Sequence, residues 1–202
     1  ARVTGVQTCA LPIYVLFYQN YTYVADISAI VLCIICWLLL HSSYTVREKS
    51  LIIFKAGTVC LMMATVCSIS FHTAITRITE SRKILIYVLQ DGIYLLLILT
   101  FVLLCNYFGT LLKLEERPAR LLGAVSWGGY AVFAFLEIGS PFTHLGFYID
   151  ADLMVHQNFY FDPFRFAYIY YCIVLVVVLF TYRKKFVLKM LRCLAYRSEE
   201  RR

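Results

Sequence analysis

Residues 172–180 read CIVLVVVLF, and residues 183–185, which follow almost at once, read RKK. In a soluble protein the β-branched residues of this run would suit a buried strand. Here the run belongs to an apolar stretch from about 166 to 182, long enough for a helix to cross most of a ~30 Å hydrocarbon core. A basic cluster directly after such a stretch is typical of the point where a helix leaves the membrane. The stretch therefore predicts a transmembrane helix.

Four further apolar stretches precede it, at about 24–43, 51–75, 84–112 and 121–138. The stretch at 121–138 is the least apolar of these, because it contains three glycines and Glu137. Gly123 and the pair Gly128-Gly129 are expected to let neighbouring helices approach closely. We therefore predict an all-α membrane protein, built as a bundle of five transmembrane helices.

The composition of the whole chain agrees with a membrane protein. Hydrophobic residues make up 61% of the 202 residues and charged residues only 15%, and the mean hydropathy is +0.75. A soluble domain of this size still exposes much of its surface, so it could not bury so many apolar side chains. We therefore expect the lipid bilayer to be the principal partner. The formal net charge of +7 fits loops on anionic lipid better than nucleic-acid binding.

Most of the cysteines lie within the apolar stretches. They are Cys33, Cys36, Cys60, Cys67, Cys105 and Cys172. In such places cysteine is expected to serve as a small apolar packing residue rather than as part of a disulfide framework. Cys33 and Cys36 have the spacing of a metal-binding pair, but no second pair or histidine stands at a suitable distance. We therefore expect neither a metal nor a cofactor.

The two ends of the chain look unlike the rest. Residues 3–13, VTGVQTCALPI, resemble the in-frame translation of a sequencing adapter, and residues 197–202, RSEERR, resemble the partner adapter in reverse complement. A signal peptide is disfavoured, because residues 1–13 carry one positive charge and no continuous apolar core. We therefore expect residues 1–13 to be an unstructured artefact and residues 14–194 to form the membrane domain. Residues 195–202 are then a truncated end with an adapter-like tail.

Basic residues are expected mostly on one side of the bundle. If the C-terminus is inside, the cytoplasmic side holds Arg47, Lys49, Lys55, Lys113, Arg117, Arg120, Arg183, Lys184, Lys185, Lys189 and Arg192, and the outer side holds Arg77, Arg82, Lys83 and Arg165. Because Lys and Arg are enriched on the cytoplasmic side of membrane proteins, this distribution predicts the N-terminus out and the C-terminus in. The cluster at 77–83 is an exception to the rule. Lys55, near the inner end of its stretch, is expected to extend its ammonium group to the interface.

The longest connection, residues 139–165, contains many aromatic residues and too many polar groups to cross a membrane. Two partly alternating segments, HLGFYID at 144–150 and LMVHQNFYF at 153–161, flank a turn near Ala151 and Asp152. They indicate a β-hairpin over the outer mouth of the bundle, although an interfacial belt of Tyr and Phe explains the composition equally well. Residues 183–194 have the pattern of an amphipathic juxtamembrane helix, which either lies on the membrane or continues the last helix as a stalk.

No nucleotide-binding loop, catalytic triad order or zinc-protease motif occurs in the sequence, so no catalytic residue is assigned. Several ionisable residues nevertheless fall at one level of the predicted bundle, near its outer end. They form a candidate sensing pocket of Asp91, Glu137, His72, Asp150, His156, Asp162 and Arg165, with Asp26 at the same level. Asp91 and Glu137 lie deepest in the apolar stretches, where a carboxylate needs a partner or a proton. The pattern predicts a site for a small ligand or an ion.

Three stretches carry a family resemblance. They are SSYTVREKSLIIFKAG at 42–57, LCNYFGTLLKL at 104–114 and SPFTHLGFYIDADLMVHQNFYFDPFRFAYIYY at 140–171. Together they resemble the multi-helix N-terminal membrane regions of bacterial signalling proteins, in which a GGDEF diguanylate cyclase domain follows, often with an EAL phosphodiesterase domain. The resemblance covers nearly all of residues 14–196 and rests on helix lengths, loop lengths and aromatic dipeptides.

The resemblance implies a sensory module in the bacterial cytoplasmic membrane, which relays a stimulus to a cytoplasmic output domain in the same chain. Any turnover of cyclic di-GMP would belong to that downstream part, because no GGDEF or EAL motif is present here. The sensor region of a histidine kinase has the same features and remains an alternative. A fragment of a transporter is a rival from another class, although its polar residues would be expected at mid-membrane. A structural or assembly protein of the membrane is a third hypothesis. Homodimerisation of the module is left open.

Overall fold

Five α-helices and a two-stranded sheet make up the part of the chain that the computed structural model describes, residues 23–43, 49–144, 146–150, 153, 155–157 and 162–183. The helices are α2 (Val24–Ser43), α3 (Lys49–Ile75), α4 (Lys83–Leu111), α5 (Glu116–Thr143) and α6 (Pro163–Thr181). A short 3-10 helix, η1 (Glu80–Arg82), joins α3 to α4. Strands β1 (Phe147–Ile149) and β2 (Val155–Gln157) lie between α5 and α6 in the sequence. The predicted number of helices is confirmed.

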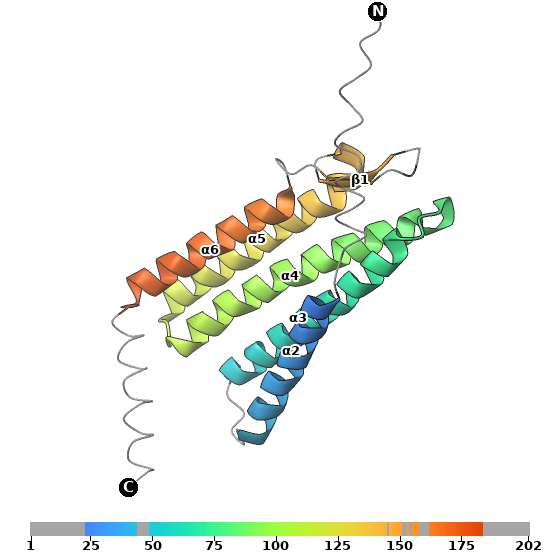
Figure 1. Ribbon diagram of the computed structural model, residues 1–202. Helices are drawn as coiled ribbons and strands as arrows, with labels where there is room; N and C mark the ends of the chain where they lie inside the picture. Colours follow the sequence, from blue (N-terminus) through green and yellow to red (C-terminus); the bar gives the residue numbers. More distant parts are fainter. Residues whose placement is uncertain are drawn as a thin grey trace, which may run out of the picture.

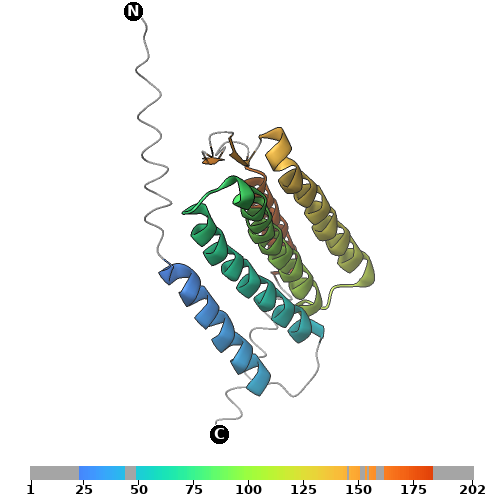
Figure 2. The same cartoon turned by 90° about the vertical axis from the view of Figure 1, so that its right-hand side faces the viewer.

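The helices lie side by side, with α4 at the centre of the bundle (Figures 1 and 2). α4 contacts α3, α5 and α6, whereas α2 contacts α3. The two strands lie at one end of the bundle, which we call the hairpin end (Figure 1). At the opposite end α3 and α5 begin and α4 and α6 finish. We call it the basic end, because Lys49, Lys113 and Arg183 lie there.

One buried core lies where α4, α5 and α6 meet. Ile98, Val102 and Cys105 of α4 are fully buried there, together with Ala167 and Tyr171 of α6. The methyl side chain of Ala167 takes little space, which lets α6 come close to its neighbours, and the Tyr171 ring stacks on Phe101 of α4 with 5.9 Å between ring centroids. Small residues combined with aromatic rings favour close helix contacts in membrane proteins.

Hydrogen bonds also connect α5 and α6 within this core. The Tyr171 hydroxyl donates to the Ser126 carbonyl at 2.8 Å, and the Tyr170 hydroxyl donates to the Val125 carbonyl at 2.9 Å. The Ser126 hydroxyl is satisfied within its own helix, where it donates to the Leu122 carbonyl at 2.6 Å. Polar groups in this part of the core are therefore paired, as burial requires.

The glycine prediction for α5 is correct at one of three positions. A Cβ atom on Gly129 would lie only 2.5 Å from the Tyr170 ring, so Gly129 permits the close approach of α6. Cβ atoms on Gly123 and Gly128 would have no described neighbour within 4 Å. These two glycines therefore do not mediate helix packing among the described residues.

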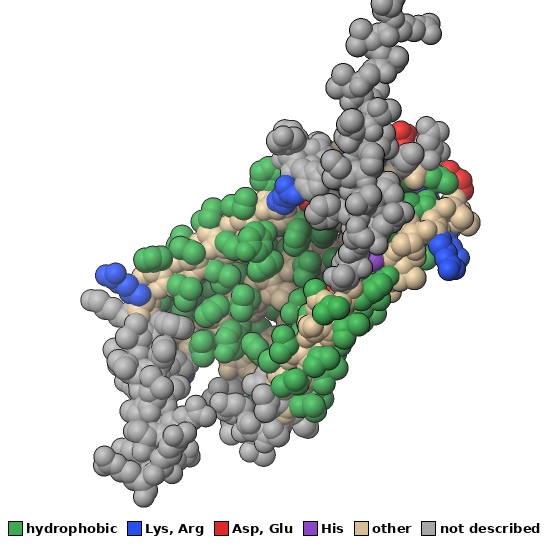
Figure 3. All heavy atoms as spheres, in the orientation of Figure 1, with side chains coloured by type: hydrophobic (Ala, Val, Ile, Leu, Met, Phe, Trp, Pro, Cys, Tyr) green, Lys and Arg blue, Asp and Glu red, His purple; other side chains and the backbone are tan. Residues whose placement is uncertain are grey.

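Apolar side chains cover the outside of the bundle as well as its inside. Phe142, Phe135 and Phe180 are 86%, 78% and 70% exposed, and hydrophobic side chains spread over the helices in Figure 3. Such a surface would be unfavourable in water. Within the described residues, α3, α4 with η1, α5 and α6 are long and apolar enough to cross a membrane, and α2 is apolar over Val24–Leu38. These are the features of a multi-pass membrane protein.

Helices α5 and α6 begin three or more residues earlier than their apolar stretches suggested. α5 begins at Glu116 and ends at Thr143, beyond the expected 121–138 at both ends. Pro118 is accommodated because it lies in the first turn, where the missing N–H has no intrahelical partner to lose. α6 begins at Pro163 instead of 166, because Asp162 caps it. The expected juxtamembrane helix at 183–194 and the adapter-like ends lie almost entirely outside the described residues.

The predicted hairpin is present as a short antiparallel pair. Phe147 pairs with Gln157, Tyr148 with His156, and Ile149 with Val155. The Phe147 ring packs edge-to-face against Phe71 of α3 at 5.7 Å and against Tyr87 of α4 at 5.8 Å. The Ile149 N–H donates to the Tyr87 hydroxyl at 2.7 Å, and the Lys83 ammonium donates to the Asp150 carbonyl at 3.3 Å. The hairpin is therefore anchored on the ends of α3 and α4.

Candidate functional site

The seven residues of the predicted pocket all lie at the hairpin end, but they do not form one cluster. Glu137 of α5, Asp91 of α4 and Asp162 at the start of α6 are close enough for their charges to interact. Arg165 joins them through an ion pair with Asp162, 3.8 Å between Nε and Oδ2. We call Asp91, Glu137 and Asp162 the acidic cluster. It brings together three helices that are separated in the sequence.

Glu137 is the most deeply placed charged side chain of the cluster. It is only 2% exposed, and its Oε2 atom has no hydrogen-bond partner among the described residues. The charges that act on it most strongly come from Asp162 and Asp91, both acidic. A buried polar group without a partner is costly, and a charged one more so. Such an exception in a folded protein is the place to look for a function.

Ser140 lies one turn after Glu137 on α5 and adds a second unsatisfied group. The Ser140 side chain is 2% exposed, and its hydroxyl oxygen has no hydrogen-bond partner among the described residues. A Cβ atom on Gly146 would lie 2.5 Å from this oxygen and 3.3 Å from Cδ of Pro163. Ser140 is therefore enclosed between the hairpin and the start of α6, and Gly146 is needed for that close approach.

Asp162 has a structural role in addition to its charge. It is the N-cap residue of α6, and its Oδ1 atom accepts a hydrogen bond of 3.0 Å from the Phe164 N–H. Pro163 follows at the first helical position, where proline is favoured. The Asp162 side chain is 5% exposed, whereas that of its ion-pair partner Arg165 is 51% exposed. Asp162 thus connects the acidic cluster directly to the start of α6.

Asp91 lies two turns into α4, on the same face as Tyr94. The Tyr94 ring stacks on Phe164 of α6, with 4.6 Å between centroids and 9° between planes. Gln90, next to Asp91, is 5% exposed. The first turn of α6 therefore packs against α4 through an aromatic pair one turn beyond Asp91.

The other three predicted residues, His72, His156 and Asp150, have no described contact with the acidic cluster. His72 of α3 interacts electrostatically with Asp26 at the start of α2. His156 stacks on Tyr148 of the facing strand, with 4.9 Å between ring centroids. Asp150 has an exposed side chain beyond the end of β1. His72 and His156 therefore have partners of their own outside the acidic cluster.

Three further residues of the hairpin end, Ser140, Gly146 and Tyr87, were not predicted from the sequence. Nothing local distinguishes Ser140 from a serine that bonds its own helix, as Ser126 does. The cap, in contrast, had a recognisable signal, because Asp followed by Pro is a strong N-terminal helix signature. Across the described residues, no group of three His, Cys, Asp or Glu side chains is placed to hold a metal ion.

Comparisons with known proteins identify no relative of this chain. No protein-family model, no curated protein and no solved structure matches it.

Proposed function

We propose that the chain is the membrane-embedded sensory module of a bacterial signal-transduction protein. In this proposal it relays an extracytoplasmic or membrane stimulus to a cytoplasmic diguanylate cyclase or phosphodiesterase domain in the same chain. The observation that carries the proposal is the position of Glu137. Its buried carboxylate has an unsatisfied oxygen and interacts electrostatically with Asp162, the N-cap residue of α6. A ligand that changes the charge at Glu137 would act on the start of the last described helix.

The acidic cluster favours a positively charged ligand or a proton as the stimulus. Three carboxylates interact there, and the basic partner Arg165 is half-exposed and pairs with Asp162. A cation bound near Glu137 would satisfy a group that otherwise carries the cost of burial. The stimulus must bind one arrangement of the bundle more tightly than another, because only differential binding shifts a two-state equilibrium. We propose that the two arrangements differ in how α6 packs against α4 and α5.

The distribution of charge supports an outward-facing hairpin end. Among the described residues, the basic end has Lys49, Lys55, Lys113, Arg117, Arg120 and Arg183 against Glu115 and Glu116. The hairpin end has Arg77, Arg82, Lys83 and Arg165 against Asp26, Glu80, Asp91, Glu137, Asp150 and Asp162. An excess of Lys and Arg is typical of the cytoplasmic side. In this proposal α6 therefore runs from the outer surface towards the cytoplasm of a bacterial cell.

The sequence of the gene beyond the codon for Tyr196 is the direct test of the class. The proposal expects a GGDEF, an EAL or both within the next few hundred codons. A histidine kinase motif would keep the sensory role and replace the output. Several further apolar stretches would contradict the proposal and favour a transporter. Orientation is tested separately with C-terminal fusions, in which green fluorescent protein should fluoresce and alkaline phosphatase should stay inactive.

The role of the acidic cluster is tested in the protein with its output domain attached. Output is measured while external pH and polyamine concentration are varied one at a time. If the output of the wild type depends on one of these conditions, Glu137→Gln should abolish that dependence, because it removes the charge of the side chain and keeps its shape. Glu116→Gln is the matched control, since that side chain is exposed at the basic end, and it should respond as the wild type does. Identical responses in both variants would contradict a sensing role for Glu137.

A further inference from the structure

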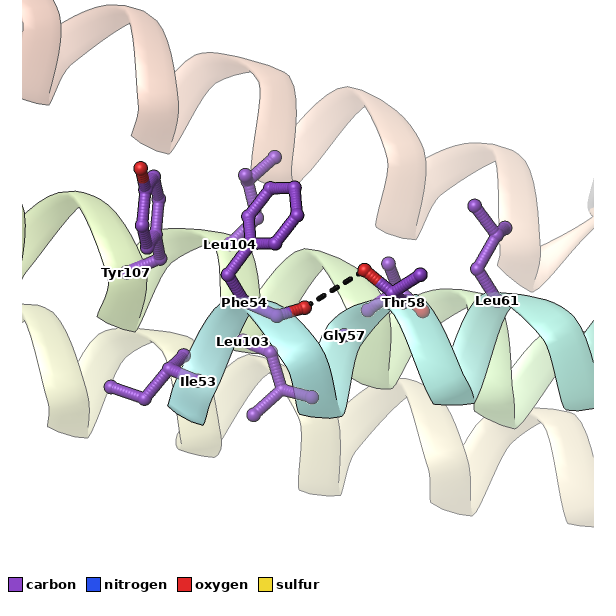
Figure 4. A pocket seen from close by; sticks show the side chains of 9 residues that line it. Ile53, Phe54, Gly57, Thr58, Leu61, Leu103, Leu104 and Tyr107 are labelled. Carbon is purple, nitrogen blue, oxygen red and sulfur yellow. Dashed lines mark hydrogen bonds between the residues drawn. The ribbon is translucent and has the colours of Figure 1, made fainter. Parts of the chain in front are cut away.

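A second site, separate from the acidic cluster, lies near the basic end between α3 and α4. It is a partly open cleft of about 150 Å³. Its lining comes from two helix faces: Ile53, Phe54, Gly57, Thr58, Leu61, Thr100, Leu103, Leu104 and Tyr107. Figure 4 shows Phe54, Leu61 and Tyr107 pointing to the same side of the two helices. The Phe54 and Tyr107 rings lie 5.5 Å apart at one end of the cleft.

The polar atoms of the lining leave little for a polar ligand to bind. The Thr58 hydroxyl donates to the Phe54 carbonyl at 3.0 Å (Figure 4), and the Thr100 hydroxyl donates to the Leu96 carbonyl at 2.8 Å. Both hydroxyls are therefore satisfied within their own helices. Most other lining side chains are hydrocarbon. A cleft of this chemistry, in helices with an apolar outer surface, fits a hydrocarbon chain.

The length of the cleft along α3 fits within one leaflet of a bilayer. With a rise of ~1.5 Å per residue, Ile53 lies ~6 Å and Leu61 ~18 Å from Lys49 along α3. The cleft therefore extends over ~12 Å, within the ~15 Å hydrocarbon half-thickness of a bilayer. Its position along the helices is that of an acyl chain whose headgroup lies at the level of Lys49.

The charges around the mouth of the cleft favour an anionic headgroup. Lys49 precedes Ile53 by four residues, so it lies on the same face of α3 as the lining. Lys55 is partly buried on the next turn of α3, and Lys113 is exposed directly beyond the end of α4. The helices α3 and α4 contribute no Asp or Glu at the basic end, and the acidic residues nearest to these lysines in the sequence are Glu48, directly before Lys49, and Glu115, two residues after Lys113. An anionic lipid headgroup is attracted to such a group of lysines.

We propose that this cleft binds one anionic phospholipid, with an acyl chain between α3 and α4 and its phosphate among Lys49, Lys55 and Lys113. The site does not depend on the acidic cluster, on the orientation of the chain or on its output. Binding here would stabilise the packing of α3 on α4.

The test uses the full chain purified in mild detergent. Native mass spectrometry counts bound lipids, and thermal unfolding is followed during titration with dioleoyl phosphatidylglycerol or dioleoyl phosphatidylcholine. We expect one phosphatidylglycerol to bind saturably and more tightly than phosphatidylcholine. Lys49→Gln and Lys113→Gln should each weaken phosphatidylglycerol binding about fivefold. Each lysine near an anionic lipid surface contributes about 1 kcal/mol to binding, which corresponds to about that change in affinity. Their binding of phosphatidylcholine should not change.

The cleft itself is tested by filling it. Gly57→Leu should abolish saturable binding, and Gly128→Leu is the control, because a Cβ on Gly128 of α5 would have no described neighbour within 4 Å. Gly57→Ala replaces the leucine variant if that variant does not fold, because the alanine Cβ would meet Leu103 at an ordinary contact distance of 3.8 Å. The alanine variant should weaken lipid binding. Equal binding of the two lipids, or unchanged binding in the Gly57 variant that folds, would overturn the proposal. So would a lipid-free dimer that Gly57→Leu converts to a monomer, because a second copy would then occupy the cleft.

Discussion

Gly129 of α5 lies directly against the ring of Tyr170 of α6, so closely that a Cβ atom on Gly129 would be 2.5 Å from Cε1 and 3.2 Å from the hydroxyl oxygen. The ring cannot simply turn away, because its hydroxyl donates to the Val125 carbonyl at 2.9 Å. The close approach of the Tyr170 ring to Gly129 and the hydrogen bond of its hydroxyl to Val125 therefore depend on each other. The pair shows how a glycine in a membrane helix can be required by one specific neighbour.

Gly129→Ala should destabilise the bundle by about 1–3 kcal/mol, because the added methyl group forces the Tyr170 ring to move and strains a packed contact. Unfolding in mixed detergent micelles measures the effect. Gly128→Ala, with no described neighbour within 4 Å of the new Cβ, should stay close to the wild type. In a Tyr170→Ala background the cost of Gly129→Ala should disappear. A cost that persists there would show that the helix backbone, not the ring, is the cause.

Tyr171→Phe should lower stability by about 0.6 kcal/mol, the average for hydrogen bonds between membrane helices, and by no more than about 1.7 kcal/mol. The change removes only the donor to the Ser126 carbonyl and leaves the ring in its fully buried position. The same unfolding measurement applies. Tyr107→Phe is the comparison at the basic end, where ring contacts with Phe54 and Phe108 persist. An equal loss in both variants would argue against the interhelical bond as the cause.

Tyr87→Phe should loosen the hairpin and leave the helices intact. It removes the acceptor of the Ile149 N–H, and a buried donor left without a partner costs about 1–3 kcal/mol. Hydrogen exchange followed by mass spectrometry should show faster exchange in residues 146–157 and unchanged exchange in α5 and α6. Tyr148→Phe keeps the stacking of that ring on His156 and should exchange as the wild type does. Faster exchange throughout the bundle would instead indicate global destabilisation.

Asp162→Ala and Asp162→Asn should separate the two roles of this residue. Alanine removes the cap of α6 and should cost about 1 kcal/mol, whereas asparagine caps almost as well as aspartate. Both substitutions remove the negative charge beside Glu137. Thermal unfolding should therefore distinguish the two variants, while any response that depends on the charge of the acidic cluster should change equally in both. If asparagine destabilised the protein as much as alanine, the charge rather than the cap would account for the loss.

Length and composition were enough to predict the number of helices, because a span needs a minimum apolar length wherever it lies. The packing of the helices could not be predicted in the same way. Lipid and protein interior are equally apolar, so Ile98, which is fully buried, and Phe135, which is 78% exposed, look alike in the sequence. The glycines illustrate the difficulty, since only contact with Tyr170 distinguishes Gly129 from Gly128.

The candidate site was predictable in part for a related reason. Asp91 and Glu137 stand out in the sequence because carboxylates are rare in apolar stretches. Their proximity to Asp162 depends on α4, α5 and α6 meeting at the hairpin end, which no local pattern encodes. Ser140 could not be recognised, because its enclosure requires Gly146 and Pro163 to close over it. The separation of His72 from the cluster likewise follows from the position of α2 beside α3.

The hydrogen bonds of Tyr170 and Tyr171 divide α6 into two arms of unequal length. From Pro163 to Tyr171 the helix extends ~12 Å, and from Tyr171 to Thr181 it extends ~15 Å. If α6 pivots where these tyrosines bond to α5, a sideways shift of ~1 Å at Pro163 moves the far end of α6 by ~1.2 Å in the opposite direction. A displacement at the hairpin end of α6 would then arrive at the basic end slightly enlarged and in the opposite direction. The length of the helix would not change.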